Sequence, residues 1–332
     1  MQGASGRAAA RGQPLLLNAH LFAVAFGLAG LAQAWSTVRQ LAGASDWPGN
    51  VLWIVTGLIW LITLAAYLTN IARQRRWNTV LSDPTFAPFA ALIFIVPMLL
   101  GVALAQQARG AGEIVFGCGA ALTVLAGAWI SAGWITLSGD LRSWHPGYFL
   151  PTAAGGLIAA DCSATLGFAT LSHVLFGLGV GSFVVLASII SLRLYVLPAL
   201  PPPLLPTMAI EVAPPVVAGN SWFAINGGRV DLAVALLAGF SVLMLLVQLR
   251  LISLYRTAPF GPGFWAFSFP LAAAVTFGLH WLAAEHVHGR TALGYTIVGI
   301  LTAAFALLAA WTIAGLINGT FLPRAVAAGP SG

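Results

Sequence analysis

The sequence has 332 residues, of which 59% are hydrophobic and 7% are charged. A soluble globular domain has about 25% charged residues, so this composition, with a mean hydropathy of +0.93, excludes a soluble domain and indicates a polytopic membrane protein. The net charge of +6 comes from arginine alone, and we interpret it through membrane topology rather than nucleic-acid binding. Cys118 and Cys162 both lie in apolar runs, which indicates neither a disulfide framework nor a thiolate metal site.

The chain has room for about ten membrane spans, because each span needs roughly 20 apolar residues. We expect an all-α fold with an N-terminal tail at 1–14, a transmembrane domain at 15–320 and a C-terminal tail at 321–332. In chain order, the expected spans are 15–38, 49–71, 86–107, 112–137, 147–168, 170–196, 204–225, 230–253, 264–284 and 291–318.

The N-terminus has an alternative interpretation. Arg7 and Arg11 precede an apolar run that ends in Ala32-Gln33-Ala34, which resembles a signal-peptidase site. This run is longer than the ~7–15 residues of a signal core, and its removal would leave an odd number of spans. We therefore expect the first span to be retained, and sequencing of the mature N-terminus would test this.

The distribution of arginine predicts the orientation, since arginine is enriched in short loops on the cytoplasmic side of a membrane. With ten spans, the side opposite the N-terminus receives only Arg39, Arg109, Arg229 and Arg290, and the remaining arginines fall on the N-terminal side. We therefore expect both termini in the cytoplasm and the protein in the inner (plasma) membrane.

Prolines divide the spans into two kinds. A proline removes an N–H group and clashes with the carbonyl four residues back, so it bends or breaks a helix. Bent helices that line a cavity and straight helices that cover it would give five tandem hairpins around a central pore. Alternatively, the kinks only help the helices to pack. The prolines lie in the odd-numbered spans from the third to the ninth and are Pro88, Pro97, Pro151, Pro206, Pro214, Pro215 and Pro270.

Glu211 is the one carboxylate deep inside an expected span. Glu211 and Phe269 follow prolines by five and seven residues on helices expected to start from the cytoplasm, so both side chains should reach similar depths, which would let them face one cavity. An ionised carboxylate there would be costly. Either its proton is exchanged during transport, or it hydrogen-bonds backbone freed near Pro214 and Pro215 and is structural.

The ninth span begins with a stretch at 261–270 that is rich in glycine, proline and aromatic residues. Pro270 lies well inside the apolar run that continues to His280, so we expect the helix to bend or break with Phe269 at the bend. Freed backbone groups survive at membrane depth only where protein covers them or where they line a watery cavity. Thr276 and His280 share a helical face with Phe269. His280 therefore either lines an outer vestibule or is satisfied by a neighbouring helix.

Other polar groups give weaker signals. The loop at 285–288 contains a glutamate and two histidines, but such loops are common and we expect neither a metal site nor a cofactor. Arg229 and Asp231 are expected to form an interfacial pair. The rival class of function is a membrane-embedded enzyme, which needs a nucleophile and a base, or a metal cluster, meeting at one depth. The scattered histidines and carboxylates give no such spacing.

Four stretches, in this order, resemble the tellurite-resistance/dicarboxylate transporter family, which includes the slow-type anion channels of guard cells. They are Pro146-Gly-Tyr-Phe-Leu-Pro151 after His145, Thr207-Met-Ala-Ile-Glu-Val-Ala-Pro-Pro215, Ile225-Asn-Gly-Gly228 and Trp265-Ala-Phe-Ser-Phe-Pro270. The resemblance implies five tandem hairpins, odd-numbered helices around a pore, a phenylalanine that occludes the pore, and a homotrimer in membrane lipid. The implied substrates are small anions such as chloride, nitrate, sulfite or C4-dicarboxylates, with a possible link to tellurite resistance.

Carried over residue by residue, the occluding phenylalanine matches Phe269, the aromatic before Pro270. Phe22 resembles the family's aromatic near the pore entrance, although Ala25 replaces the proline that usually follows. The sequence therefore does not decide whether the first helix bends. Bent helices place partial positive charge at half-helix N-termini, so dipoles rather than a fixed cation would stabilise an anion. The expected pore-lining or coupling residues are Phe22, Pro151, Glu211, Pro214, Pro270, Thr276 and His280.

Overall fold

The computed structural model describes residues 17–43, 45–74, 86–136 and 140–322, and this part of the chain contains helices and no strand. Eight of the described helices are long and apolar enough to cross a membrane. Nearly all of the two expected tails, with Arg7, Arg11 and Arg324, lies outside the described residues, as do Arg75 and Arg76. The all-α polytopic fold predicted from composition is confirmed.

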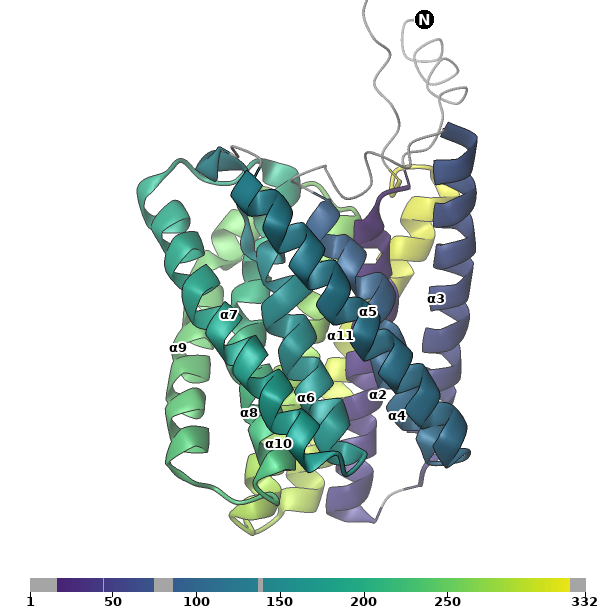
Figure 1. Cartoon of the computed structure of the whole chain (residues 1–332), viewed down its shortest axis with the longest axis vertical. Coiled ribbons are helices and arrows are strands. Elements are labelled where there is room, and N and C mark those ends of the chain that lie inside the picture. The colour runs from purple at the N-terminus through teal and green to yellow at the C-terminus, as the bar shows by residue number, and fades with distance from the viewer. Residues whose placement is uncertain (1–16, 44, 75–85, 137–139, 323–332) are drawn as a thin grey trace, which may run out of the picture.

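Inner and outer helices alternate along the chain (Figure 1). In the candidate spans, the most buried outer helix is 33% buried and the least buried inner helix is 50% buried. The inner helices are α2 (Phe22–Ala42), α4 (Leu92–Ala105), α6 (Gly155–Thr165), α8 (Ala213–Ile225) and α10 (Ser268–Ala284). The outer helices are α3 (Trp47–Gln74), α5 (Arg109–Thr136), α7 (Ala169–Val196), α9 (Leu232–Tyr255) and α11 (Arg290–Ile317).

The five inner helices form a closed ring. Helix α2 packs against α4, α4 against α6, α6 against α8 and α8 against α10, and α10 returns to α2. Each outer helix follows an inner helix and packs against it, with α10 and α11 as the last pair. This is the arrangement of five hairpins that the alternation of prolines predicted.

Each inner helix begins with a turn that is not α-helical. These segments are η1 (Ala19–Leu21), η3 (Ala87–Ala91), η5 (Pro146–Phe149) with the π-helical η6 (Leu150–Ala154), η7 (Pro202–Val212) and η8 (Pro262–Phe267). A further short turn, η4 (Leu141–Ser143), precedes η5. All five predicted inner spans are therefore built from two or more helical pieces, and the fifth and seventh are not among the eight candidate spans.

Prolines explain where the segments η7 and η8 end. A helix tolerates proline in its first turn, where the N–H group has no intrahelical partner. Pro214 and Pro215 occupy the first turn of α8, and Pro270 is the third residue of α10. The break expected around Pro270 is thus real, but it lies between Phe267 and Ser268.

The start of α2 and the end of α11 lie at the same end of the molecule (Figure 1). Arg39 lies in the last turn of α2, Arg109 and Arg290 begin α5 and α11, and Arg229 lies three residues before α9, so these four arginines share the opposite end. The described arginines therefore follow the predicted partition.

Candidate functional site

A small apolar cavity lies inside the ring, where the five inner α-helices begin. Its volume is about 20 Å³, enough for a single water molecule. Every inner helix or its initial turn contributes to the wall, which is formed by Ala23, Phe26, Phe89, Leu92, Leu150, Ala154, Ile210, Ala213, Trp265, Ala266, Phe269 and Pro270. Five helix dipoles therefore direct their positive ends toward this cavity. We call it the inner cavity.

Two stacked phenylalanine rings close one wall of the inner cavity. Phe26 of α2 and Phe269 of α10 have ring centroids 3.7 Å apart and an interplanar angle of 13°. Both side chains are buried, with exposed fractions of 5% and 3%. The cavity next to the rings has room for only one water molecule.

Gly30 lets the ring of Phe269 take this position. A Cβ atom at residue 30 would lie 2.9 Å from Cβ of Ala272 and 3.0 Å from Cδ2 of Phe269. Contacts this short between carbon atoms are repulsive. The lack of a side chain at Gly30 is therefore a condition for the close approach of α2 and α10.

A larger cavity, more polar than the inner cavity, lies at the other end of the inner α-helices and has a volume of about 360 Å³. We call it the outer vestibule. From Phe269 to His280, which lines the vestibule, the path along α10 is about 16 Å at the helical rise of about 1.5 Å per residue. The vestibule is lined by Gln33, Ser36, Thr37, Gln40, Trp53, Leu99, Val102, Ala103, Gln106, Asp161, Cys162, Thr165, Phe223, Ala224, Gly228, His280 and Ala283. All five inner helices thus enclose both cavities.

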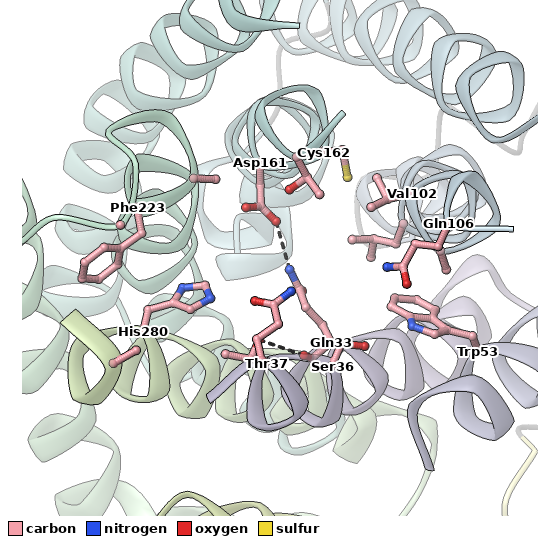
Figure 2. A pocket seen from close by; sticks show the side chains of 17 residues that line it. Gln33, Ser36, Thr37, Trp53, Val102, Gln106, Asp161, Cys162, Phe223 and His280 are labelled. Atoms are coloured by element: carbon pink, nitrogen blue, oxygen red, sulfur yellow. Dashed lines mark hydrogen bonds between the residues drawn. The ribbon is translucent and has the colours of Figure 1, made fainter. Parts of the chain in front are cut away.

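A hydrogen bond crosses the outer vestibule. The amide Nε2 of Gln33 on α2 donates to Oδ2 of Asp161 on α6 over 2.9 Å. Figure 2 shows this bond with His280 and Phe223 on one side of it and Trp53, Val102 and Gln106 on the other.

The comparison with known proteins agrees with this architecture. Residues 17–313 match the family model SLAC1, described as voltage-dependent anion channel. The chain belongs to the SLAC1 voltage-dependent anion channel family. It is also similar to the Tellurite resistance protein TehA homolog of Haemophilus influenzae, with 28% identity over 313 residues that cover 93% of this chain and 94% of that protein.

Membership of the SLAC1 family assigns anion transport across a membrane to this chain and places it among channels and transporters rather than enzymes. It also confirms the family resemblance drawn from the four motifs. Since the matched residues extend over nearly the whole chain, the ring and both of its cavities lie within the matched region.

The structure brings some of the predicted site residues of this SLAC1 family member to the two cavities. Phe269 and Pro270 line the inner cavity and His280 lines the outer vestibule. Thr276 is buried between them, and its hydroxyl donates to the carbonyl of Ala272 over 3.0 Å within α10. The shared helical face on α10 therefore contacts both cavities only at its ends.

The other predicted residues point elsewhere. Phe22 is fully buried and packs edge-on against Tyr67 of α3, with centroids 5.6 Å apart. The carbonyl of Pro151 faces α5 at Gly127. Neither these residues nor Pro214 are among those that line the inner cavity.

Glu211 belongs to η7, which packs against α9, the helix that carries Tyr255. It does not line the inner cavity beside Phe269, although its neighbour Ile210 does. A cavity shared by Glu211 and Phe269 therefore stays a prediction, which the lining of the inner cavity does not support. Oε1 of Glu211 is buried and has no hydrogen-bond partner among the described residues.

A correction concerns Arg229 and Asp231, for which the sequence predicted an interfacial pair. Asp231 instead caps α9 by accepting from the backbone N–H of Val234 over 3.0 Å, and it also accepts from the indole of Trp222 over 2.8 Å. These hydrogen bonds, with one from Asn226, lower the pKa of Asp231 from 3.8 to about 2. The guanidinium of Arg229 donates to the carbonyl of Asn226.

Sequence reasoning missed Phe26, Gln33 and Asp161 as residues that line the two cavities. Phe26 is one apolar residue in an apolar run and gives no signal of its own. Gln33 and Asp161 are polar residues inside predicted spans, and polar groups within a membrane are costly and usually functional. That rule could have selected both, but their pairing depends on how α2 and α6 face each other.

Proposed function

We propose that this protein forms a pore for small anions through the ring of inner helices, and that the ring of Phe269 closes it. The observation that carries the proposal is the stack of Phe269 on Phe26 inside a closed ring of five helices, between a cavity for one water molecule and a polar vestibule. Such an apolar constriction blocks ions by excluding water.

The same geometry supports selection for anions without a fixed cation. The inner cavity is lined by apolar side chains and receives the positive ends of five helix dipoles. Weak binding of this kind suits conduction, because an ion must leave the site as readily as it enters. We propose chloride, nitrate, sulfite or C4-dicarboxylates such as malate as substrates. The name of the relative TehA homolog makes tellurite resistance a related role to test.

The proposed setting is the inner (plasma) membrane, with both termini in the cytoplasm and a homotrimer as the assembly. The outer helices expose large apolar side chains such as Ile114, Trp129 and Ile135 on α5, which suit contact with lipid or with a second copy. Mass measurement in mild detergent tests the trimer, and a monomer that conducts would show that each chain contains its own pore.

A second candidate function is proton-coupled transport of a dicarboxylate or sulfite, with Glu211 as the group that exchanges the proton. The buried Oε1 without a partner favours it, because a carboxylate in that position is costly when charged. The two candidates differ in their driving force. A pore carries current under voltage alone, whereas a coupled carrier also accumulates substrate under a pH gradient.

The test of the proposed function is flux into proteoliposomes with a panel of anions and an imposed voltage or pH gradient. We expect Phe269→Ala to conduct more than the unaltered protein, because the variant lacks the ring that closes the pore. Equal flux in the two proteins, both folded and reconstituted to the same density, would remove Phe269 from the gate.

A further inference from the structure

The hydrogen bond between Gln33 and Asp161 joins helices that are not neighbours in the ring. Helix α4 lies between α2 and α6 on one side, and α8 and α10 lie between them on the other. The side chains therefore meet across the interior of the vestibule rather than along its wall (Figure 2). An ion that moves along the ring axis passes close to this bridge.

The bridge also contains the carboxylate of the vestibule. Asp161 is the only carboxylate among the residues that line the cavity, and no arginine lines it. Within the described ranges, the ion pairs are Arg39 with Asp46 and Arg109 with Glu113, so the carboxylate of Asp161 has no cationic partner there. A negative charge at this place repels the ions that the family transports.

We propose that the bridge between Gln33 and Asp161 is a second barrier on the anion path, in series with Phe269. This proposal rests on the proposed function, because the second barrier lies on the proposed pore. The bridge narrows the vestibule through the contact of the two side chains, and the carboxylate lowers the local concentration of anions. Repulsion grows with the charge of the ion, so divalent anions are held back more than monovalent ones.

The two parts of the barrier can be separated by two substitutions. Asp161→Asn removes the charge but keeps a side-chain oxygen that accepts from Gln33. Gln33→Ala removes the bridge and keeps the charge. Both are made in the Phe269→Ala background, because in the unaltered protein the closed ring of Phe269 limits the flux and hides a second barrier.

We expect Asp161→Asn to raise conductance on the order of fivefold for a monovalent anion, from one charge repulsion at about 4 Å in water. The rise should be larger for sulfate than for chloride. Gln33→Ala should raise both conductances by a similar factor, because it widens the path without changing the charge. If both double variants conduct like Phe269→Ala alone, with the same ratio of sulfate to chloride, the bridge is not a barrier.

Two matched controls lie outside the vestibule. Gln107→Ala removes an exposed amide just after the end of α4 that does not line the vestibule. Glu285→Gln removes a carboxylate at the end of α10, which is exposed and does not line the vestibule. Salt screens an exposed charge beyond about 8 Å at physiological ionic strength. Both controls should leave conductance and the sulfate-to-chloride ratio unchanged.

A measurement that does not depend on conduction keeps this inference separate from the proposed function. Thr165 is exposed, lines the vestibule and lies one helical turn after Asp161 on α6. A Thr165→Cys reporter, made with Cys118→Ser and Cys162→Ala, is treated with thiol reagents of equal size that are anionic, cationic or neutral. We expect the cationic reagent to react faster than the anionic one, and Asp161→Asn to remove this difference.

The outcomes separate the two ideas. One outcome is that no variant carries anion flux but Asp161→Asn changes the ratio of the cationic to the anionic reaction rate. In that case Asp161 sets the charge of the vestibule, and the proposed function fails. If Phe269→Ala conducts and Asp161→Asn changes neither the reagent ratio nor the sulfate-to-chloride ratio, the second barrier is wrong and the proposed function stands.

Discussion

Phe26 and Phe269 lie face to face, with ring centroids 3.7 Å apart, and join the first inner helix to the last at the level of the inner cavity. The stack links the two ends of the chain, since α2 and α10 are separated by most of the sequence. Each ring packs against the other, so the position of the Phe269 side chain depends on Phe26 of α2.

The stack predicts the effects of two substitutions. Phe269→Ala should raise anion conductance most, because it removes the ring that closes the pore in the proposed function. Phe26→Ala should raise it by a smaller factor, since Phe269 remains but can leave its position more often. Conductance of reconstituted protein, corrected for the amount inserted, measures both.

Phe22 provides the matched control on the same helix. It is as large and as buried as Phe26, but it packs against Tyr67 on the outer side of the ring. A truncation of a core phenylalanine costs about 3–5 kcal/mol, so Phe22→Ala should lower thermal stability without raising conductance. A conductance as high as that of Phe26→Ala would show that loss of packing in α2, rather than loss of the stack, opens the pore.

Gly30 gives a prediction on the spacing between α2 and α10. In Gly30→Ala the new methyl group would press on Cβ of Ala272 and on the ring of Phe269. Overpacking of this kind typically costs about 1–3 kcal/mol, so we expect a lower melting temperature and a displaced ring with altered conductance. Thermal melting in detergent and single-channel recording measure the two effects.

The control for Gly30 is Gly117 on α5, where an added Cβ would have open space around it. Alanine is the better helix former by about 1 kcal/mol, so Gly117→Ala should keep or slightly raise the melting temperature. If Gly30→Ala behaves in the same way, the close approach at Gly30 is not required for the gate.

Much of the fold followed from local features of the sequence. Apolar length predicted the spans, the prolines separated inner from outer helices, and the position of Phe269 before Pro270 placed it at the start of α10. These features depend on the chemistry of single residues or on short spacings. They are therefore visible before the helices are packed.

The rest of the site depends on how the helices face one another. Glu211 and Phe269 follow prolines at similar spacings on neighbouring segments, yet Phe269 lines the inner cavity and Glu211 does not. The bridge from Gln33 to Asp161 joins residues 128 positions apart and needs the rotation of both helices to be known. Sequence periodicity gives no rotation for a helix that is apolar on all sides.

Asp231 predicts a dependence of stability on pH. Its folded-state pKa of about 2 lies below the usual 3.8, because the ionised carboxylate accepts hydrogen bonds at the start of α9. A depressed pKa stabilises the folded state above the unfolded pKa, and this contribution is lost as the pH falls through the folded pKa. The melting temperature of the unaltered protein should therefore fall between about pH 4 and pH 2.

In Asp231→Ala the melting temperature should be lower than in the unaltered protein above pH 4, and the difference should shrink toward pH 2. Glu285→Ala, which removes an exposed carboxylate at the end of α10, is the control and should show no such convergence. Parallel melting curves of the unaltered protein and Asp231→Ala at every pH would mean that the cap does not contribute through its charge.

Glu211 predicts a dependence of flux on pH. Its Oε1 is buried without a partner in the described structure, and the polar groups nearby are engaged with each other: Tyr255 donates to Gln248, which donates to the carbonyl of Met208. A proton on Glu211 removes a charge that would otherwise be buried near the pore wall. If that proton is exchanged during transport, flux should increase as the pH is lowered.

Glu211→Gln mimics the protonated form. It should keep flux high at neutral pH and flatten the dependence on pH, measured as anion uptake into proteoliposomes at a series of equal inner and outer pH values. Tyr255→Phe is the control, because it removes a neighbouring hydroxyl and keeps the carboxylate, so the pH dependence should remain. If Glu211→Gln folds and transports with the pH profile of the unaltered protein, Glu211 is structural, and the pore then carries anions without coupling to protons at this residue.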